Sequence, residues 1–159
     1  MTFDPARAAE AGDLAAVWPW VGRDAPRGVG EDQVVALESR LGLSLPDDFR
    51  DYLRFWSPPS DTEETDEDVT TWWALDRMAT LSEGYEHPVK LPSVQEAAND
   101  YLLFADGCFW CWAWALCCGE GPDRGRVVLI DGKDRFVADS FSDFMRIYLK
   151  DPKRLSPGG

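Results

Sequence analysis

Six carboxylates stand within eight positions of this sequence, inside the run SDTEETDEDVTTWW at residues 60–73. No lysine or arginine interrupts the run, so its charges repel one another at neutral pH and oppose compact packing. In a solvated run such acids remain ordinary ionised groups rather than tuned general acids and bases. The run predicts either a solvated loop or a landing surface for a basic partner. Its carboxylates and the two following tryptophans are Asp61, Glu63, Glu64, Asp66, Glu67, Asp68, Trp72 and Trp73.

Two interpretations of this run stay open. In the first, the carboxylates attract a cationic protein surface and raise the association rate, while a tryptophan anchors the contact. Because a strand would alternate the directions of Trp72 and Trp73, at most one of them is expected at the surface. In the second, the run is a solvated loop that keeps the protein soluble.

The other reactive side chains give weaker signals. Cys108 and Cys111 form a C-x-x-C pair, but their neighbours favour a strand rather than the helix start that lowers a thiol pKa. A zinc site with Cys117 and Cys118 would need that adjacent pair to point the same way, which a strand forbids. The single histidine, His87, has no nucleophile at a recognisable spacing. We therefore expect no catalytic residue, cofactor or metal. The alternative of a thiol enzyme would require a lowered pKa at Cys108 or Cys111.

Length and charge narrow the class of protein. The chain has 159 residues, of which 45% are hydrophobic, so one folded domain over residues 1–159 is expected. With 16 basic and 29 acidic residues the formal net charge is -13, which argues against nucleic acid or an anionic membrane as the ligand. The sequence predicts no signal peptide and no membrane span. The four cysteines are expected to be reduced thiols, so we expect a cytoplasmic protein.

The N-terminal half predicts helices. An extension over residues 1–29 contains a short apolar helix at 14–20. A helix over 31–41 has acidic residues in its first turn and Gly42 as its stop, and a second helix over 46–56 begins at Pro46. The acidic loop then covers 57–69, a strand covers 70–75, and residues 81–100 predict a long irregular connection.

The second half predicts strands over 101–107, 108–118, 126–131 and 135–140, joined by short turns. Such connections favour an antiparallel meander. A final helix over 140–152 has Ser140 and Asp143 as a capping box. The expected fold is therefore α+β, with an antiparallel sheet of about four to six strands and one face covered by helices from the N-terminal half and by the C-terminal helix.

The run CFWCWAWALCC places three tryptophans on one face of the strand expected over 108–118, opposite small residues. Three aromatic side chains left open to solvent would favour aggregation, so something must cover them. The tryptophans therefore form either a second core layer or an exposed aromatic platform that a partner covers. Both possibilities stay open. The three residues are Trp110, Trp112 and Trp114.

Four segments carry a pattern that recurs in one family: VVALESRLGLSLPDDFRDYLRFW near the N-terminus, and YLLFADG, GRVVLIDG and VADSFSDFMRIYL in the second half. Through these segments, residues 30–150 resemble the SMI1/KNR4 family, also called the SUKH superfamily. Between these ends the family usually has a short segment, where this sequence has SPPSDTEETDEDV. The resemblance implies that the matching motif residues lie mainly in the core and at the helix junction. They are Glu38, Leu41, Gly42, Leu45, Pro46, Phe49, Leu53, Ser140, Phe141 and Phe144.

The resemblance also implies a non-enzymatic binding domain, and in bacteria most often an immunity protein that neutralises a cognate toxin by stoichiometric binding. A nuclease-like toxin would be basic because it must hold phosphates, which suits a chain of net charge -13. The alternative is a SUKH-like regulatory or scaffold domain without a toxin partner. Members bind through variable surfaces, so the resemblance assigns no binding residue, and the toxin and the oligomeric state stay open.

Overall fold

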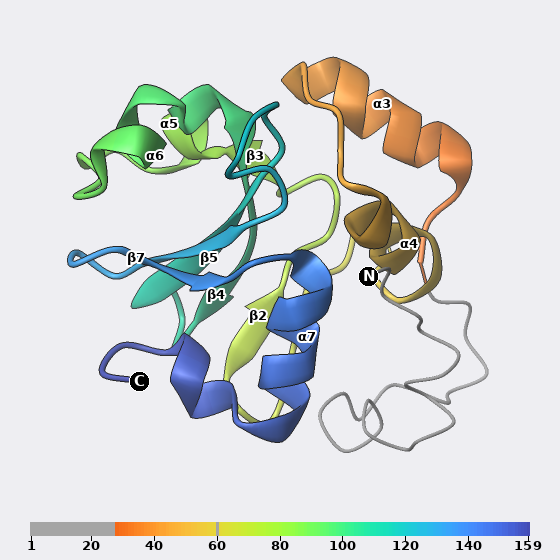
Figure 1. The fold of residues 1–159 in the computed structure, drawn as a ribbon. Coiled ribbons are helices and arrows are strands. Elements are labelled where there is room, and N and C mark those ends of the chain that lie inside the picture. The colour runs from red at the N-terminus through yellow and green to blue at the C-terminus, as the bar shows by residue number, and fades with distance from the viewer. Residues whose placement is uncertain (1–27, 60) are drawn as a thin grey trace.

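An antiparallel sheet of seven strands organises the computed structural model, which describes residues 28–59 and 61–159 (Figure 1). The strands run in the order β1-β2-β4-β5-β6-β7, and β3 pairs with β4 off this path. The predicted α+β class is confirmed; the sheet exceeds the expected four to six strands because β1 and β3 each have only two residues. The strands are β1 (Glu64–Thr65), β2 (Thr70–Trp72), β3 (Ala79–Thr80), β4 (Tyr101–Gly107), β5 (Trp112–Cys117), β6 (Val127–Ile130) and β7 (Arg135–Ala138).

The strands β4 to β7 form the expected antiparallel meander. One predicted boundary is wrong, because β5 begins at Trp112 rather than at residue 108. The strand expected over 70–75 is also shorter, since the chain leaves the sheet after Trp72 and returns to the same edge of β4 as β3. Residues 73–78 therefore form a connection between two short strands that pair with opposite ends of β4.

The two predicted helices of the N-terminal half are confirmed, as is the C-terminal helix. Gly42 adopts φ 68° just past the first of these helices, where its left-handed conformation ends the helix as expected. Ser140 accepts a hydrogen bond of 3.0 Å from the backbone of Asp143 and so caps the last helix. The extension predicted over 1–29 lies outside the described residues except for Gly28 and Val29. The helices are α3 (Glu31–Leu41), α4 (Asp47–Phe55), α5 (Leu81–Gly84), α6 (Pro92–Glu96), α7 (Phe141–Lys150) and two 3₁₀ turns, η1 (Ala98–Asp100) and η2 (Pro152–Leu155).

Helices lie against both faces of the sheet, which corrects the expectation that only one face is covered. On one face, Trp114 of β5 packs edge-on against Phe144 of α7 at 5.5 Å between ring centroids. Its neighbour Ala115 points to the other face and pairs with Leu103, against which Gly84 of α5 packs. Figure 1 shows α7 and α5 on these two sides of the sheet.

Most of the motif residues are structural. Leu45, Phe49, Leu53, Phe141 and Phe144 are buried. Phe49 packs edge-on against Phe141 at 4.9 Å between ring centroids, which joins α4 to α7 over the sheet. Rings packed in this way contribute about 1 kcal/mol each beyond the area they bury. These residues therefore hold α4 and α7 together.

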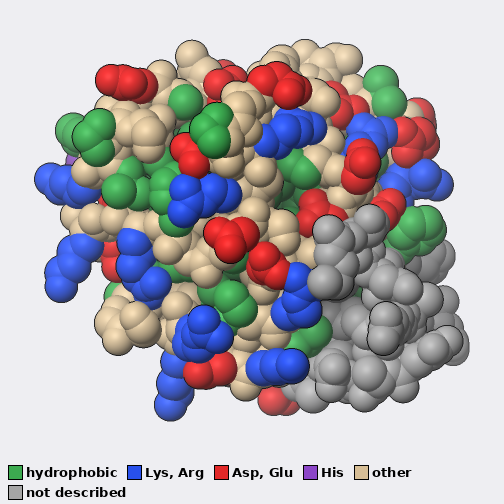
Figure 2. Space-filling model, in the orientation of Figure 1, with side chains coloured by type: hydrophobic (Ala, Val, Ile, Leu, Met, Phe, Trp, Pro, Cys, Tyr) green, Lys and Arg blue, Asp and Glu red, His purple; other side chains and the backbone are tan. Residues whose placement is uncertain are grey.

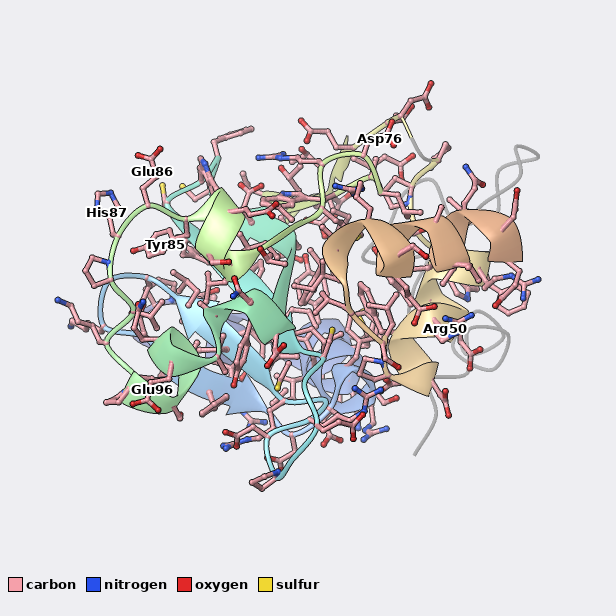
Figure 3. All side chains as sticks on the ribbon, turned by 90° about the horizontal axis from the view of Figure 1, so that it is seen from above. Arg50, Asp76, Tyr85, Glu86, His87 and Glu96 are labelled. Carbon is pink, nitrogen blue, oxygen red and sulfur yellow. The ribbon has the colours of Figure 1, made fainter. Side chains whose placement is uncertain are left out.

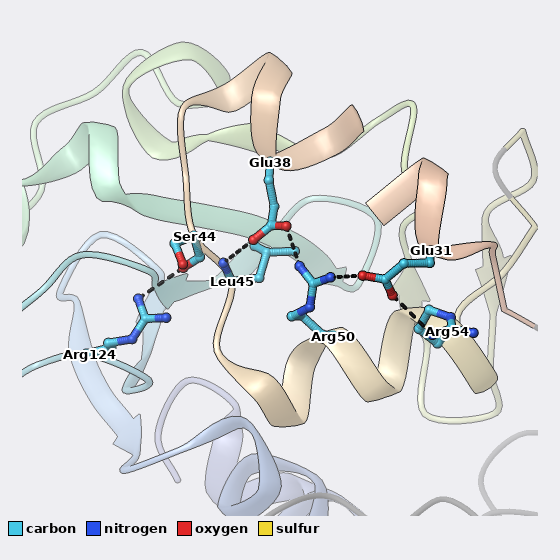
Figure 4. A network of polar contacts seen from close by, with 7 residues as sticks. All are labelled: Glu31, Glu38, Ser44, Leu45, Arg50, Arg54 and Arg124. Carbon is cyan, nitrogen blue, oxygen red and sulfur yellow. Dashed lines mark hydrogen bonds and ion pairs between the residues drawn. The ribbon is translucent and has the colours of Figure 1, made fainter. Parts of the chain in front are cut away.

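Glu38 links the first two helices (Figure 4). One of its carboxylate oxygens accepts a hydrogen bond of 2.9 Å from the backbone N–H of Leu45, and the other pairs with Arg50 of α4. Arg50 also pairs with Glu31 at the start of α3. The carboxylate thus satisfies a backbone donor that the tight α3–α4 connection leaves without a helical partner.

Replacing Glu38 with alanine is expected to lower the free energy of unfolding by about 2 kcal/mol, because a charge-assisted hydrogen bond and an ion pair are lost together. Replacement with glutamine keeps an oxygen that can accept from Leu45 and should cost less than half of this. The matched control is Glu31→Ala, at the exposed end of the same network. Urea unfolding of the three variants measures the order, and an equal loss from Glu31→Ala would contradict the role of Glu38.

Candidate partner-binding surface

The acidic run lies at the edge of the sheet and is only partly a solvated loop. Glu64 and Thr65 form β1, which pairs with β2. Glu63 forms an ion pair with Arg77, a cation that stands beyond the run in sequence. The carboxylates that remain exposed are Asp61, Glu63, Glu67 and Asp68, while Glu64 is half-buried.

Asp66 is buried, with 6% of its surface exposed, so its assignment as a partner-binding residue is wrong. One carboxylate oxygen accepts from the indole N–H of Trp72 at 3.0 Å and from the hydroxyl of Tyr148 on α7. The other accepts from the backbone N–H groups of Asp68 and Thr70 at 3.0 and 3.1 Å. Burial raises the pKa of Asp66, although these hydrogen bonds act in the opposite direction. Asp66 ties the acidic segment to the core.

Trp72 and Trp73 are both buried, so neither is the surface anchor that the sequence predicted. Trp72 packs edge-on against Tyr148 at 5.1 Å between centroids, on the α7 side of the sheet. Trp72 and Trp73 do point in opposite directions, as expected, but the side of the sheet toward which Trp73 points is covered as well. There Trp73 donates a 2.7 Å hydrogen bond to Asp106 and packs at 5.3 Å against Trp110.

The exposed aromatic side chains lie instead at the turn between β4 and β5. Phe109 is 76% exposed and Trp110 is 45% exposed. Of the three tryptophans expected together on one strand face, Trp110 lies in the turn instead. Half-buried Trp112 and buried Trp114 stay on one face of β5, with 6.5 Å between their ring centroids. Only Trp110 belongs to an exposed aromatic platform.

This turn has a strained and well-supported backbone. Cys108, Phe109 and Trp110 have φ of 52°, 53° and 74°, a left-handed conformation that costs on the order of 1 kcal/mol for each non-glycine residue. Three hydrogen bonds hold it: the N–H of Trp110 donates to buried Asp106 at 2.7 Å, that of Cys108 to Val69 at 2.9 Å, and that of Cys111 to Gly107 at 3.1 Å. The surrounding structure thus presents Phe109 in a fixed position.

Arg77 connects the turn to the acidic segment. Its guanidinium lies 4.2 Å from the centre of the Trp73 ring and 5.9 Å from that of Trp110. It pairs with Glu63 and lies 3.5 Å from the carboxylate of Asp106. The aromatic rings and carboxylates around Arg77 therefore already bind one guanidinium group of the chain itself. Surroundings of this kind stabilise cationic groups.

Trp110 also lines a cleft of about 540 Å³. One wall is the segment that follows α5, where Glu86 and His87 project outward in Figure 3. Burial, with the negative charges of Asp134 and Asp131, raises the pKa of the Tyr85 hydroxyl, so this group stays a neutral hydrogen-bond donor. Carboxylates and aromatic rings share the cleft lining, which includes Glu83, Tyr85, Glu86, Trp110, Trp112 and Asp131.

We call this continuous region the hairpin-tip face. It consists of the β4–β5 turn with its exposed aromatics, the exposed acidic segment on one side and the carboxylate-lined cleft on the other. Its residues are Asp61, Glu63, Glu67, Asp68, Arg77, Glu83, Glu86, Phe109, Trp110 and Asp131.

Charge is divided unevenly along the chain. Residues 101–159 carry eight basic and eight acidic side chains, so the whole net charge of -13 comes from residues 1–100. Figure 2 shows Asp and Glu side chains along the upper edge, over α3, α5 and α6, and Lys and Arg over the lower part near the C-terminus. On this face of the molecule, acidic and basic side chains therefore gather over different elements.

Among the described residues, His87 and Cys111 line the same cleft. Cys117 and Cys118 are buried at the far end of β5 from Cys108 and Cys111. His87 lies in the exposed segment after α5, where its ring packs against that of Tyr85 with 5.5 Å between the centroids. Within residues 28–59 and 61–159, no three His, Cys, Asp or Glu side chains gather closely enough to hold a metal ion. Nor does any helix in this part of the chain have the length and apolar character that crossing a membrane requires.

Comparison with known proteins places this fold. The model of the SMI1 / KNR4 family (SUKH-1) matches residues 28–147, which is most of the chain. The matched range includes the whole of α3 and of α4. No curated protein matches the chain. The family match agrees with the resemblance seen in the two motif-bearing ends, and the buried motif residues occupy the core of the domain that it covers. The chain therefore belongs to the SMI1/KNR4 family (SUKH-1).

Proposed function

We propose that this protein is an immunity-type binding protein that neutralises a cognate basic toxin by covering it, one molecule to one, through the hairpin-tip face. The observation that carries the proposal is Phe109, a large apolar side chain left 76% exposed on a firmly held turn between two groups of carboxylates. An exposed aromatic with a charged rim is the arrangement that protein interfaces use for a central anchor. Membership of a family of immunity-type domains, non-catalytic in general, supports the same conclusion.

The physical mechanism has two stages. The exposed carboxylates of the acidic segment attract a positively charged surface over a distance of about 8 Å at physiological salt, which raises the association rate. Phe109 and Trp110 then enter a depression of the partner and exclude water, which slows dissociation. A toxin that holds phosphates must expose basic groups around its active site. Pairing those groups with the carboxylates would block the substrate from the toxin without any chemical turnover.

Neutralising the acidic segment tests the first stage. The variant Asp61→Asn, Glu67→Gln, Asp68→Asn removes three exposed charges and leaves the buried Asp66 intact. We expect the association rate with the toxin to fall about 10-fold at low salt, with little change in the dissociation rate. Stopped-flow or surface-binding kinetics at several salt concentrations measures both rates.

The matched control is Glu96→Gln, Glu120→Gln, Asp151→Asn, which changes the net charge equally at exposed positions outside the hairpin-tip face. It should change the association rate less than 2-fold. An equal fall in both variants would mean that only total charge matters, and an unchanged rate in both would contradict steering by the acidic segment. A partner whose binding is insensitive to salt and to both variants would favour the scaffold function over the immunity function.

A further inference from the structure

Cys108 and Cys111 stand at the two ends of the β4–β5 turn. Cys108 follows Gly107 and Cys111 precedes Trp112, and these two neighbours are the last paired residues of the hairpin. The N–H of Cys111 donates a 3.1 Å hydrogen bond to the carbonyl oxygen of Gly107, which closes the turn and brings its two ends close together. The thiol of Cys111 donates a hydrogen bond of 2.7 Å to the carbonyl oxygen of Cys108. The turn therefore places the Cys111 thiol against the backbone of Cys108, with whose side chain it also interacts.

Access separates this pair from the other two cysteines. Cys108 and Cys111 are exposed, whereas Cys117 and Cys118 are buried in the sheet. Burial raises the pKa of Cys117 and Cys118, which keeps both as protonated, unreactive thiols. A small oxidant in solution therefore meets only the first pair.

We infer that Cys108 and Cys111 form a reversible disulfide, with glutathione disulfide or a similar small disulfide as the oxidant. The thiolate of one cysteine attacks the oxidant, forms a mixed disulfide and releases one glutathione thiolate. The thiolate of the second cysteine then attacks the sulfur of the first and releases the other glutathione. One glutathione disulfide is reduced to two glutathione thiols, which take up the two protons that the protein thiols lose.

The disulfide would close a ring around Phe109 and Trp110. Both residues lie in the left-handed stretch of the turn, a conformation that the chain maintains only through its surroundings. A covalent link between the ends of the turn opposes its opening and so holds the two aromatic side chains ready for a partner. This consequence, unlike the disulfide itself, rests on the proposed function, and it predicts tighter binding by the oxidised protein.

Mass spectrometry of the full chain tests the disulfide without any partner. After incubation with glutathione disulfide, the native protein should lose two hydrogen atoms and no longer react with iodoacetamide at Cys108 and Cys111. Chymotrypsin cuts after Phe109 and Trp110, so the peptides on the two sides of the turn stay joined only if the disulfide has formed. We expect joined peptides that reduction with dithiothreitol separates. Two alkylatable thiols, or a lasting glutathione adduct in place of the ring, would overturn the inference.

Single variants supply the control. Cys108→Ser and Cys111→Ser should each stop at the mixed disulfide with glutathione, which is visible as a mass increase and as loss of the joined peptides. The pKa of Cys111 is raised, chiefly by its hydrogen bond with Cys108, so ring formation should accelerate as the pH rises from 7 to 9. A rate that does not change with pH would contradict attack by these thiolates.

A separate measurement tests the consequence for binding. Dissociation of the toxin from the oxidised and the reduced protein should differ at least 3-fold, with the oxidised protein slower. Equal rates would refute the link between the disulfide and the hairpin-tip face while leaving the disulfide in place. Failure of the proposed function would look different, because no basic toxin would then bind in either redox state.

Discussion

Asp66→Ala is expected to lower the free energy of unfolding by about 3 kcal/mol, the largest stability change among the carboxylates of the acidic run. The substitution leaves the buried indole N–H of Trp72 and the hydroxyl of Tyr148 without their shared acceptor. It also removes the hydrogen-bonded link that Asp66 makes between β2 and α7 and leaves only their ring packing. The control Glu67→Ala lies next to Asp66 in sequence but is exposed, and it should change stability by less than about 0.5 kcal/mol. Urea unfolding measures both, and similar values would contradict the structural role of Asp66.

The pH dependence of stability gives a second view of the same group. Burial raises the pKa of Asp66 above the value of about 3.9 that an aspartate has in an unfolded chain. Between these two pKa values the folded state binds a proton that the unfolded state has lost. The contribution of Asp66 to stability is therefore complete below the unfolded pKa and declines as the pH rises through the folded pKa. The un-ionisable variant Asp66→Asn lacks this term, so the stability of the native protein relative to it should fall as the pH rises from about 4.

Phe109→Ala is expected to weaken binding of the toxin about 30-fold, because an aromatic side chain at the centre of an interface typically contributes 2 kcal/mol or more. The side chain is 76% exposed in the free protein, so its removal should leave the midpoint of thermal unfolding unchanged. Titration calorimetry with the toxin measures the affinity. The loss should come from faster dissociation rather than slower association.

Phe55→Ala is the matched control for this variant. Phe55 is the other strongly exposed phenylalanine of the described residues, at 53%, and lies on α4 outside the hairpin-tip face. It should change the affinity less than 2-fold. Trp110→Ala should also weaken binding, but Trp110 covers Trp73, so that variant needs a stability measurement beside it. Equal affinity losses from Phe55→Ala and Phe109→Ala would contradict the assigned surface.

Local signals in the sequence were sufficient for the helices and the meander. The helix over 31–41 has apolar residues at helical spacing and a glycine at its end, and the last helix has its cap at Ser140. These features act within a few residues, so they can be read without knowing the rest of the chain. The boundary of β5 could not be read in this way, because Cys108 and Phe109 favour a strand by composition while the hairpin turns at them.

The candidate site was harder to predict because burial depends on distant residues. Asp66 lies among exposed acidic residues in the sequence. No residue near it predicts the hydrogen bond that it accepts from Tyr148, a tyrosine 82 positions away. One of Trp72 and Trp73 was expected at the surface, but both are buried, and Trp110 covers Trp73 from the neighbouring hairpin. Phe109 could have been noticed as a large apolar residue beside Asp106-Gly107, a turn signal, although the turn itself begins one residue later.

Capture from a lysate of the organism that carries this gene tests the central claim most directly. Two baits are compared: the native protein, and a variant with the substitutions Phe109→Ala, Asp61→Asn, Glu67→Gln and Asp68→Asn. Each bait is washed at low and at high salt, and the retained proteins are identified by mass spectrometry. The account predicts a basic toxin domain that the native bait retains at low salt, that high salt releases and that the variant bait fails to retain. Retention of the same toxin by both baits, or capture only of partners insensitive to salt, would contradict binding through the hairpin-tip face.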